Sequence, residues 1–258
     1  MSYCGHDEQS GGRYETVAAA KGDAAKQELV GEQNPDAALL DRRLMQRIYG
    51  SFHSVIAQAV ERKNLPSSFL AALTANESSG RPDAACYEPA VYERLKSVAT
   101  GQATSFGSID WQSLRAVFQQ NLEGWASGAQ MGLSALELDD QIRGALSQIE
   151  ERDLRGLATS WGLTQIMGYH VVGRKVGVHS LLDPVFHYRF AVELLGDFAG
   201  RFELDLGKDF DSLFRCWNTG HPDGRTYDPD YVPRGLRRMR VYEDVARASS
   251  SEEPARPK

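Results

Sequence analysis

Glu77 is the side chain whose setting in the sequence most favours acid–base chemistry. It follows Leu73 by four positions and Leu70 by seven, so on a helix it shares their apolar face. Gly80-Arg81-Pro82 then ends the helix, which places Glu77 in its last turn. Burial and the negative end of the helix dipole raise the pKa of a carboxyl group, as a proton donor to a leaving group requires. The alternative is a side chain that reaches into solvent or pairs with Arg81.

Two later segments carry groups suited to a polyhydroxylated ligand. Ser160-Trp161-Gly162-Leu163-Thr164-Gln165-Ile166-Met167-Gly168 contains an aromatic plate, a glycine that admits a close neighbour and an amide. Cys216-Trp217-Asn218-Thr219-Gly220 places an amide at a helix end, and Tyr227 and Tyr231 follow it. Taken singly, each segment is more often part of a core or a helix cap.

Helical periodicity predicts the elements that position these residues. Apolar residues three and four apart predict a helix from Leu44 to Val60, and Pro66 is placed to begin the next one. Asp183 and Pro184 open a third, strongly periodic helix that reaches Phe202. Residues 99–130 are expected to form short helices and loops, and 138–149 an amphipathic helix. Alternating strand patterns are nearly absent, so we expect a mainly α single domain over 37–247, between a flexible leader (1–36) and a flexible tail (248–258).

Composition and charge exclude several classes of function. The 258 residues carry 29 basic and 35 acidic side chains, a net charge of −6, which gives the chain no overall attraction to nucleic acid. No apolar run approaches the ~18 residues of a membrane-spanning helix. Met1 to Gly12 lack the order of a secretory signal, so export is expected after trimming or by another route. The six histidines lack metal-ligand spacing, and we expect no metal and no cofactor.

Two smaller features leave alternatives open. The three cysteines cannot all pair within one chain, so either Cys86 and Cys216 form a disulfide or both are buried free thiols. The cluster Arg234, Arg237, Arg238 and Arg240 is typical of a solvated helix face, and it could also contact anionic wall polymers.

The order of the motifs resembles a known family. Leu73-Thr74-Ala75-Asn76-Glu77-Ser78-Ser79-Gly80, then Ser160 to Met167, Trp217-Asn218-Thr219-Gly220 and Tyr231-Val232-Pro233-Arg234 resemble the lytic transglycosylase and goose-type lysozyme branch of the lysozyme-like superfamily. Tyr87-Glu88-Pro89-Ala90-Val91-Tyr92 and the Ser-Trp-Gly-Leu-x-Gln-Ile-Met-Gly match resemble still more the N-acetylmuramidase domain of bacteriophage endolysins. The resemblance covers about residues 44–245 and implies a lysozyme-like, transglycosylase-type fold.

The resemblance also implies roles for individual residues. Glu77 would be the catalytic acid, and Glu88 either a second carboxylate that activates water or a buried residue that shapes its loop. The residues expected to contact the glycan are Tyr87, Ser160, Trp161, Gln165, Met167, Asn218, Tyr227 and Tyr231. The stretch of about 99–157 would be an insertion that forms one wall of the cleft or a lid. Thr164, Trp217 and Thr219 depart from the family pattern, which weakens the match around Asn218.

The function expected from these features is cleavage of the β-1,4 bond between N-acetylmuramic acid and N-acetylglucosamine in peptidoglycan. The resemblance implies lytic transglycosylation, in which the substrate's own N-acetyl or 6-hydroxyl group takes the place of a second carboxylate, or hydrolysis, in which a second carboxylate activates water. The alternatives are a glycan-binding module that does not cut, and a chitin- or chitosan-cleaving enzyme of the same superfamily. The expected partner is a peptidoglycan strand, and the expected state is a monomer in the periplasm, the cell wall or the extracellular space.

Overall fold

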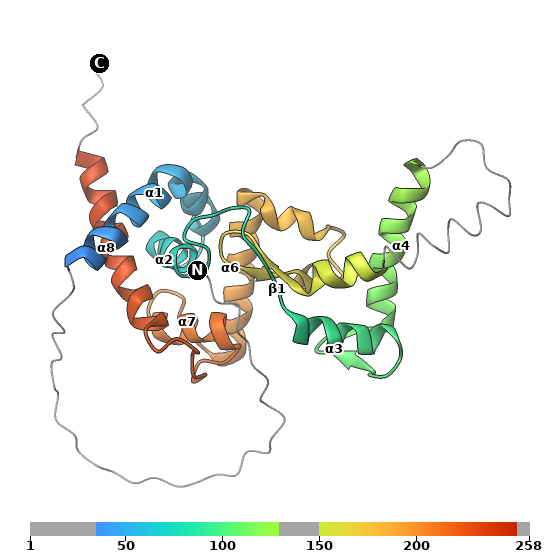
Figure 1. Cartoon of the computed structure of the whole chain (residues 1–258). Helices are drawn as coiled ribbons and strands as arrows, with labels where there is room; N and C mark the ends of the chain where they lie inside the picture. Colours follow the sequence, from blue (N-terminus) through green and yellow to red (C-terminus); the bar gives the residue numbers. More distant parts are fainter. Residues whose placement is uncertain (1–34, 129–149, 252–258) are drawn as a thin grey trace, which may run out of the picture.

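The computed structural model describes residues 35–128 and 150–251, and this part of the chain is mainly helical, as expected (Figure 1). Its elements are α1 (Pro35–Val60), α2 (Ser67–Glu77), β1 (Ala85–Tyr87), α3 (Pro89–Ala99), β2 (Ser105–Phe106), β3 (Ile109–Asp110), α4 (Trp111–Gly128), β4 (Thr159–Trp161), β5 (Ile166–Met167), the 3-10 helices η1 (Gly168–Val171) and η2 (Val178–Leu182), α6 (Pro184–Phe202), α7 (Phe210–Thr219) and α8 (Tyr231–Ser251). A further helix covers 150–157. Helices α1 and α8 extend slightly beyond the expected domain limits of 37 and 247.

Helix α2 lies at the centre of the helical bundle. It packs against α1 and α8, and α1 also packs against α6 (Figure 1). All of its residues from Ser68 to Ala75 are buried, so it has no solvated face. A helix that is enclosed on every side directs its last residue into the protein rather than into solvent. This arrangement gives Glu77 a partly enclosed position.

The ends of the predicted helices agree with the structure except at one proline. Pro66 is the N-cap of α2, in an extended conformation, and the first helical residue is Ser67 rather than Pro66. After Glu77 the chain leaves the helix through two residues with positive φ, Ser79 and Gly80, so the predicted stop is confirmed. At α6 the side chain of Asp183 accepts a hydrogen bond from the Phe186 amide at 2.7 Å, which confirms the predicted cap.

A small antiparallel sheet lies between the helical bundle and the pair α3 and α4 (Figure 1). Its strand order is β1-β4-β5, with Cys86 opposite Ser160 and Ser160 opposite Met167. The strands are two or three residues long, too short to produce the alternating pattern that identifies a strand in a sequence. The sheet nevertheless carries four of the residues expected to contact glycan: Tyr87, Ser160, Trp161 and Met167.

The region expected to be an insertion contains a longer helix than predicted. Instead of short helices and loops over 99–130, the chain forms the β2–β3 hairpin and then the 18-residue helix α4. Leu114 and Phe118 of α4 are buried. The helix predicted over 138–149 lies outside the described residues.

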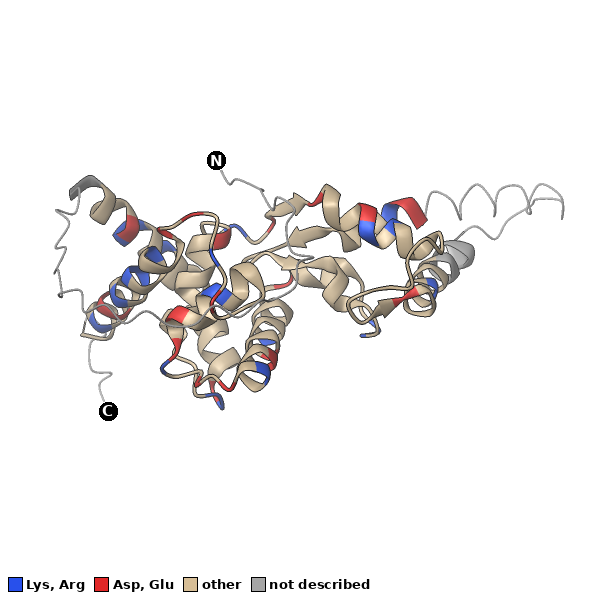
Figure 2. Cartoon of the chain, turned by 90° about the horizontal axis from the view of Figure 1, so that it is seen from below, with Lys and Arg blue, Asp and Glu red and all other residues tan. Residues whose placement is uncertain are grey.

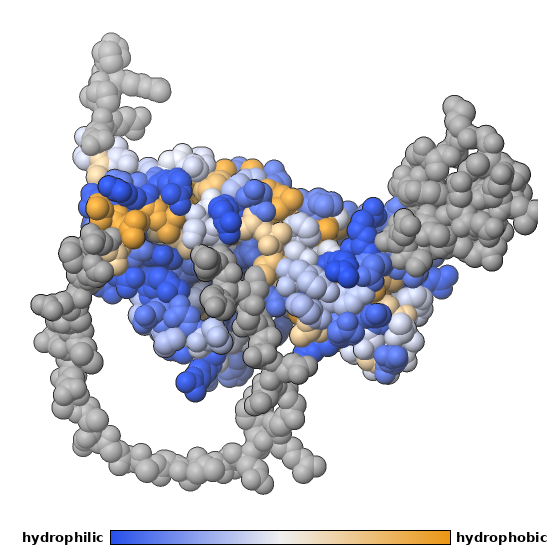
Figure 3. All heavy atoms as spheres, in the orientation of Figure 1, coloured by the Kyte–Doolittle hydropathy of each residue, from blue (hydrophilic) through white to orange (hydrophobic). Residues whose placement is uncertain are grey.

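The molecular surface mixes charges of both signs. Basic and acidic positions alternate over the helices and loops in Figure 2, in keeping with a modest net charge. On the face shown in Figure 3, apolar residues gather over α1, where Leu39 and Leu40 are exposed. Within the described ranges, none of the helices combines the length and the apolar character needed to cross a membrane.

Candidate active site at the end of helix α2

Glu77 is half-buried and faces the start of α8 rather than solvent. Its Oε1 accepts a hydrogen bond from the hydroxyl group of Tyr231. Burial raises the pKa of Glu77 from 4.5 to about 7, although the hydrogen bond from Tyr231 and the charge of Arg234 act in the opposite direction. Arg81 donates instead to the carbonyl oxygen of Ser78, at 3.3 Å, so the alternative of a Glu77–Arg81 pair is not formed. Near pH 7 a carboxyl group with this pKa can both donate and accept a proton.

Tyr231 is held beside Glu77 by a chain of hydrogen bonds that connects three helices. The side-chain amide of Asn76 donates to the carbonyl oxygen of Tyr231 at 2.9 Å, and Arg238 donates to the Asn76 amide oxygen at 2.9 Å. Arg238 also pairs with the buried carboxylate of Asp41 on α1, at 2.9 Å. Because these directed hydrogen bonds connect α1, α2 and α8, they hold the backbone of Tyr231 beside the end of α2.

The environment of Tyr231 keeps it a hydrogen-bond donor. Burial, followed by the charge of Glu77, raises the pKa of Tyr231 well above its ordinary value. The phenol therefore stays neutral at physiological pH and stabilises the charged form of Glu77 more than the neutral form. The sequence placed Tyr231 among the residues that contact the glycan, whereas in the structure its hydroxyl group is directed to the candidate acid.

The arginine cluster of α8 has structural partners. Arg237 and Arg238 both bind Asp41, with N–O distances of 3.0 and 2.9 Å, and Arg234 binds Asp228 at 2.7 Å. These three side chains are at least half-buried, so they do not form the solvated face that the sequence indicated. Arg240 is exposed.

We expect Tyr231→Phe to raise the pKa of Glu77 further, by about one pH unit, because the lost hydrogen bond is one that favours the carboxylate. NMR titration of protein with labelled glutamate carboxyl carbons measures this pKa directly. Tyr227→Phe is the matched control, since Tyr227 is 74% exposed, and it should leave the titration unchanged. A lower pKa in Tyr231→Phe would contradict the assigned hydrogen bond.

The turn between β4 and β5 is attached to the end of α2. The hydroxyl group of Ser78, the residue after Glu77, donates to the carbonyl oxygen of Leu163 at 2.7 Å. The indole of Trp217 on α7 donates to the carbonyl oxygen of Thr164 at 2.9 Å. Three segments that are distant in sequence, namely α2, the 160–168 motif and α7, therefore meet next to Glu77, as the motif order implied.

Within this turn, Ser160 and Gln165 bind each other and the backbone. Gln165 has a φ of 55°, and its amide nitrogen donates to the carbonyl oxygens of Gly162 at 2.8 Å and Ala84 at 3.2 Å. The Gln165 amide oxygen accepts from the Ser160 hydroxyl at 2.9 Å. Both protons of the Gln165 amide thus have partners inside the protein, and the two side chains close the turn. Sequence reasoning did not assign this role, and their contact with a glycan stays a prediction.

Gly162 is required by the close approach of α6. Its φ is 72°, and a Cβ atom there would lie 2.5 Å from the carbonyl oxygen of Leu181 and 2.7 Å from Nδ1 of His187. His187 is fully buried: its Nε2 accepts from the Thr164 amide at 2.8 Å, and its Nδ1 lies 2.7 Å from the Leu181 oxygen. Burial lowers the pKa of His187 to about 4, so the ring is neutral. It supports the turn between β4 and β5 through its hydrogen bond with the Thr164 amide.

The remaining residues expected to contact the glycan differ in accessibility. Asn218 and Met167 are half-buried, and Tyr227 is exposed. Asn218 makes no side-chain hydrogen bond to any described residue, which leaves its amide available. Tyr87 is half-buried and packs under the guanidinium of Arg155, 5.4 Å from the ring centroid. The indole of Trp161 donates to the Gly156 carbonyl oxygen at 2.9 Å and lines a cavity described below.

Glu88 occupies a different setting from Glu77. It is buried at the N-terminal end of α3, where its amide donates to the carbonyl oxygen of Ala158 at 2.8 Å and its Oε1 lies 3.9 Å from Sγ of Cys86. This position fits the alternative in which Glu88 shapes its loop. Cys216 is a free, buried thiol, whereas Cys86 is disulfide-bonded, so neither alternative holds: the two residues do not pair with each other, and they are not both free thiols.

The described residues include no cluster of three or more His, Cys, Asp or Glu side chains placed to hold a metal ion. The chemistry that the geometry around Glu77 offers is that of a desolvated carboxylic acid with a phenolic donor and a nearby arginine. Comparisons with protein families, with curated proteins and with solved structures find no match to this chain.

Proposed function

We propose that the chain cleaves peptidoglycan at the bond between N-acetylmuramic acid and N-acetylglucosamine, with Glu77 as the general acid. The observation that carries the proposal is the enclosed position of the Glu77 carboxyl group, which accepts a hydrogen bond from the buried Tyr231 hydroxyl group; burial there raises the pKa of Glu77 to about 7. The three motifs that resemble lytic transglycosylases meet at this residue, through Ser78–Leu163 and Trp217–Thr164. That meeting supports a glycan substrate over other substrates of acid catalysis.

In the proposed mechanism, protonated Glu77 donates its proton to the glycosidic oxygen as the bond from that oxygen to C1 of the muramic acid breaks. The resulting carboxylate then accepts the proton of the hydroxyl group on C6 of the same sugar. The C6 oxygen forms the new bond to C1 and gives a 1,6-anhydro product, and Glu77 returns to its protonated form. Neutral Tyr231 lowers the free energy of the carboxylate between the two transfers, because its hydrogen bond favours the charged form.

Transglycosylation is favoured over hydrolysis by the surroundings of the two carboxylates. A hydrolase needs a second group that activates water. The partners of Glu77 are a hydroxyl group and a cation, whereas Glu88 is buried at the start of α3 beside Ala158 and Cys86. Transglycosylation needs no second carboxylate, because the substrate supplies its own nucleophile. A Glu88 that only shapes its loop is therefore compatible with this reaction.

Mass spectrometry of peptidoglycan fragments tests the proposal. We expect soluble fragments that end in anhydromuramic acid, and Glu88→Gln should still release the same product if it folds. Fragments heavier by one water, lost in Glu88→Gln, would instead show a hydrolase. Binding to the wall without any released fragment would indicate a binding module, and release from chitin or chitosan would contradict the need for muramic acid.

A further inference from the structure

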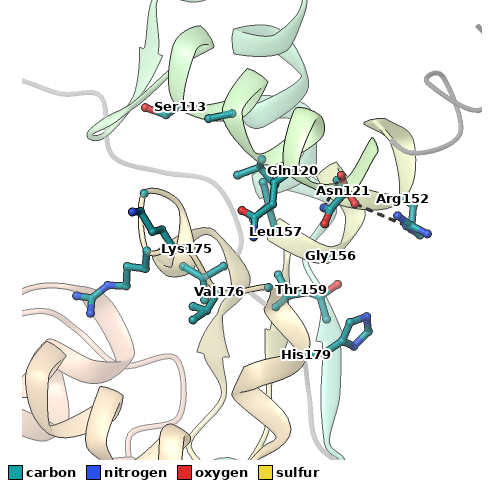
Figure 4. A pocket seen from close by; sticks show the side chains of 18 of the residues that line it. Ser113, Gln120, Asn121, Arg152, Gly156, Leu157, Thr159, Lys175, Val176 and His179 are labelled. Carbon is teal, nitrogen blue, oxygen red and sulfur yellow. Dashed lines mark hydrogen bonds and ion pairs between the residues drawn. The ribbon is translucent and has the colours of Figure 1, made fainter. Parts of the chain in front are cut away.

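A cavity of about 510 Å³ lies away from Glu77, between α4, the helix over 150–157 and the segment 171–179 (Figure 4). This volume falls in the range of about 300–1,000 Å³ that is typical of small-molecule sites. Lys175 and Val176 lie on one side, and Gln120 and Leu157 lie opposite them on the two helices (Figure 4). Of the residues expected to contact the glycan, Trp161 alone lines this cavity, and the proposed reaction uses none of its lining residues.

The walls of the cavity combine an apolar surface with an excess of positive charge. Val117, Leu157, Val178 and Trp161 supply apolar surface. The charged side chains among the described lining residues are four bases and one acid: Arg152, Arg155, Arg174, Lys175 and Asp153. Each of the three arginines has an acidic partner, so the uncompensated charge among the described lining residues is that of Lys175; together with the apolar walls it favours an anionic ligand that also has apolar groups.

Among the basic residues that line the cavity, Lys175 is the one without an acidic partner among the described residues. Arg152 lies 3.6 Å from Asp153, Arg155 pairs with Glu151 at 2.7 Å, and Arg174 pairs with Glu193 at 2.6 Å. Lys175 is exposed and forms no ion pair with any described residue.

The backbone around Lys175 is strained. Its φ is 25°, a conformation that side chains other than glycine rarely adopt. Such strain persists only where the surrounding structure imposes it, and it is concentrated at functional sites.

Gln120 adds a second available group. It is exposed on α4, lines the cavity and makes no side-chain hydrogen bond within the described part of the chain. A primary amide can donate to a carbonyl oxygen and accept from an N–H group, which are the two groups of a peptide bond. A peptide offers both of these groups to Gln120, whereas the alkyl chain of a fatty acid offers neither, so the lining complements a peptide better than a simple carboxylate with an alkyl chain.

We propose that this cavity binds a short acidic peptide. A carboxylate of the peptide pairs with Lys175, one of its amide groups meets Gln120, and its small alkyl side chains lie against Val117, Leu157 and Val178. If the chain cleaves peptidoglycan, the peptide stems on muramic acid are ligands of this kind. That identification rests on the proposed function, whereas the binding of an acidic peptide does not.

The cavity and the candidate active site are joined by one structural element. Trp161 at the end of β4 lines the cavity, and Leu163, two residues later, accepts the hydrogen bond from Ser78 next to Glu77. The β4–β5 hairpin therefore connects the cavity to the end of α2.

Isothermal titration calorimetry with two peptides of equal size tests the proposal. The acidic probe is N-acetyl-Ala-Glu-Ala, and the neutral probe is N-acetyl-Ala-Gln-Ala amide. We expect the acidic peptide to bind at least about tenfold more tightly to the full chain, because a charge-assisted hydrogen bond is stronger than a neutral one. Lys175→Gln should remove that preference, while Lys63→Gln, at an exposed lysine outside the cavity, should keep it.

A second variant tests the location of the site. Ala116 is exposed on α4 and lines the cavity, so Ala116→Trp should fill the space and abolish binding of the acidic peptide without loss of helical signal. Equal binding of the two peptides, no binding at millimolar concentration, or full displacement by decanoate would overturn the proposal. Repeating the titration in Glu77→Gln separates the two proposals, because peptide binding there does not depend on catalysis.

Discussion

Glu77→Gln is expected to lower the rate of peptidoglycan cleavage by about 10²–10⁴-fold, the usual contribution of a general acid. Glutamine has nearly the same shape as protonated glutamic acid, but its amide cannot transfer a proton to the leaving oxygen. The substitution introduces no new charge at this half-buried position. A glutamine side chain also fits beside the hydroxyl group of Tyr231, which donates to Oε1 of Glu77. Release of soluble anhydro fragments from purified peptidoglycan, followed over time, measures the loss.

Glu93→Gln is the matched control for that measurement. This variant makes the same chemical change on the exposed face of α3. The activity of the Glu93→Gln protein should therefore equal that of the unmodified protein. Far-ultraviolet circular dichroism of both variants establishes that each is folded. Turnover by Glu77→Gln within a few-fold of the control would remove Glu77 from the mechanism and favour a glycan-binding role.

The position of Glu77 could be predicted from the sequence because its cause is local. Leu70 and Leu73 lie in a helix that is buried from Ser68 to Ala75, and Gly80 supplies a positive φ after the helix ends, so Glu77 falls in the last turn of a buried helix. Helical periodicity and a glycine at the end of a helix are patterns of a few residues, so they can be recognised in a single sequence. The raised pKa follows from the same geometry.

The partner of Glu77 could not be predicted, because it comes from a distant part of the chain. Tyr231 follows Glu77 by 154 positions, and its orientation depends on the Asn76, Arg238 and Asp41 contacts. Nothing in the local pattern of these residues indicates that an arginine of α8 fixes an asparagine of α2. The same limit applies to Gln165, whose type indicated a ligand contact and whose partners are Ser160 and the backbone.

Helix α4, which forms one wall of the cavity, illustrates a signal that was present but weak. Leu114, Val117, Phe118 and Asn121 lie three and four positions apart, which is the spacing of one face of α4. Polar residues between them, such as Gln119 and Gln120, gave the region the composition of a loop. The cavity itself arises where α4 meets segments 150–157 and 171–179, and such a long-range arrangement has no local signature.

A buried acid that is useful for catalysis is expected to reduce stability at neutral pH. Burial raises the pKa of Glu77 to about 7, compared with 4.5 as the ordinary value that we take for the unfolded chain. Between these two pH values the folded protein holds a proton that the unfolded chain has lost, so folding is favoured at the acidic end and this contribution disappears as pH rises through 7. The difference between the two pKa values, at about 1.4 kcal/mol for each pH unit, corresponds to about 3 kcal/mol in the free energy of unfolding.

Other buried groups have the opposite dependence, so only a comparison of variants isolates this effect. Burial lowers the pKa values of His170 and His187 from 6.5 to about 4. Below pH 6.5 the unfolded chain binds protons that these folded histidines do not, and stability is lost as pH falls toward 4. Both histidines are retained in a variant at Glu77, so their contribution cancels when that variant is subtracted from the unmodified protein.

We therefore expect Glu77→Gln to become more stable than the unmodified protein as pH rises, by up to about 3 kcal/mol in the free energy of unfolding between pH 4.5 and pH 8. Glutamine cannot ionise, so the variant avoids the free-energy cost of a charged carboxylate at that position. Urea unfolding of both proteins at several pH values measures the difference. Parallel stability curves for Glu77→Gln and the unmodified protein would mean that the Glu77 carboxyl group titrates as it does in water. The local environment would then supply no acid at pH 7, and the catalytic proposal would lose its physical basis even if some activity were measured.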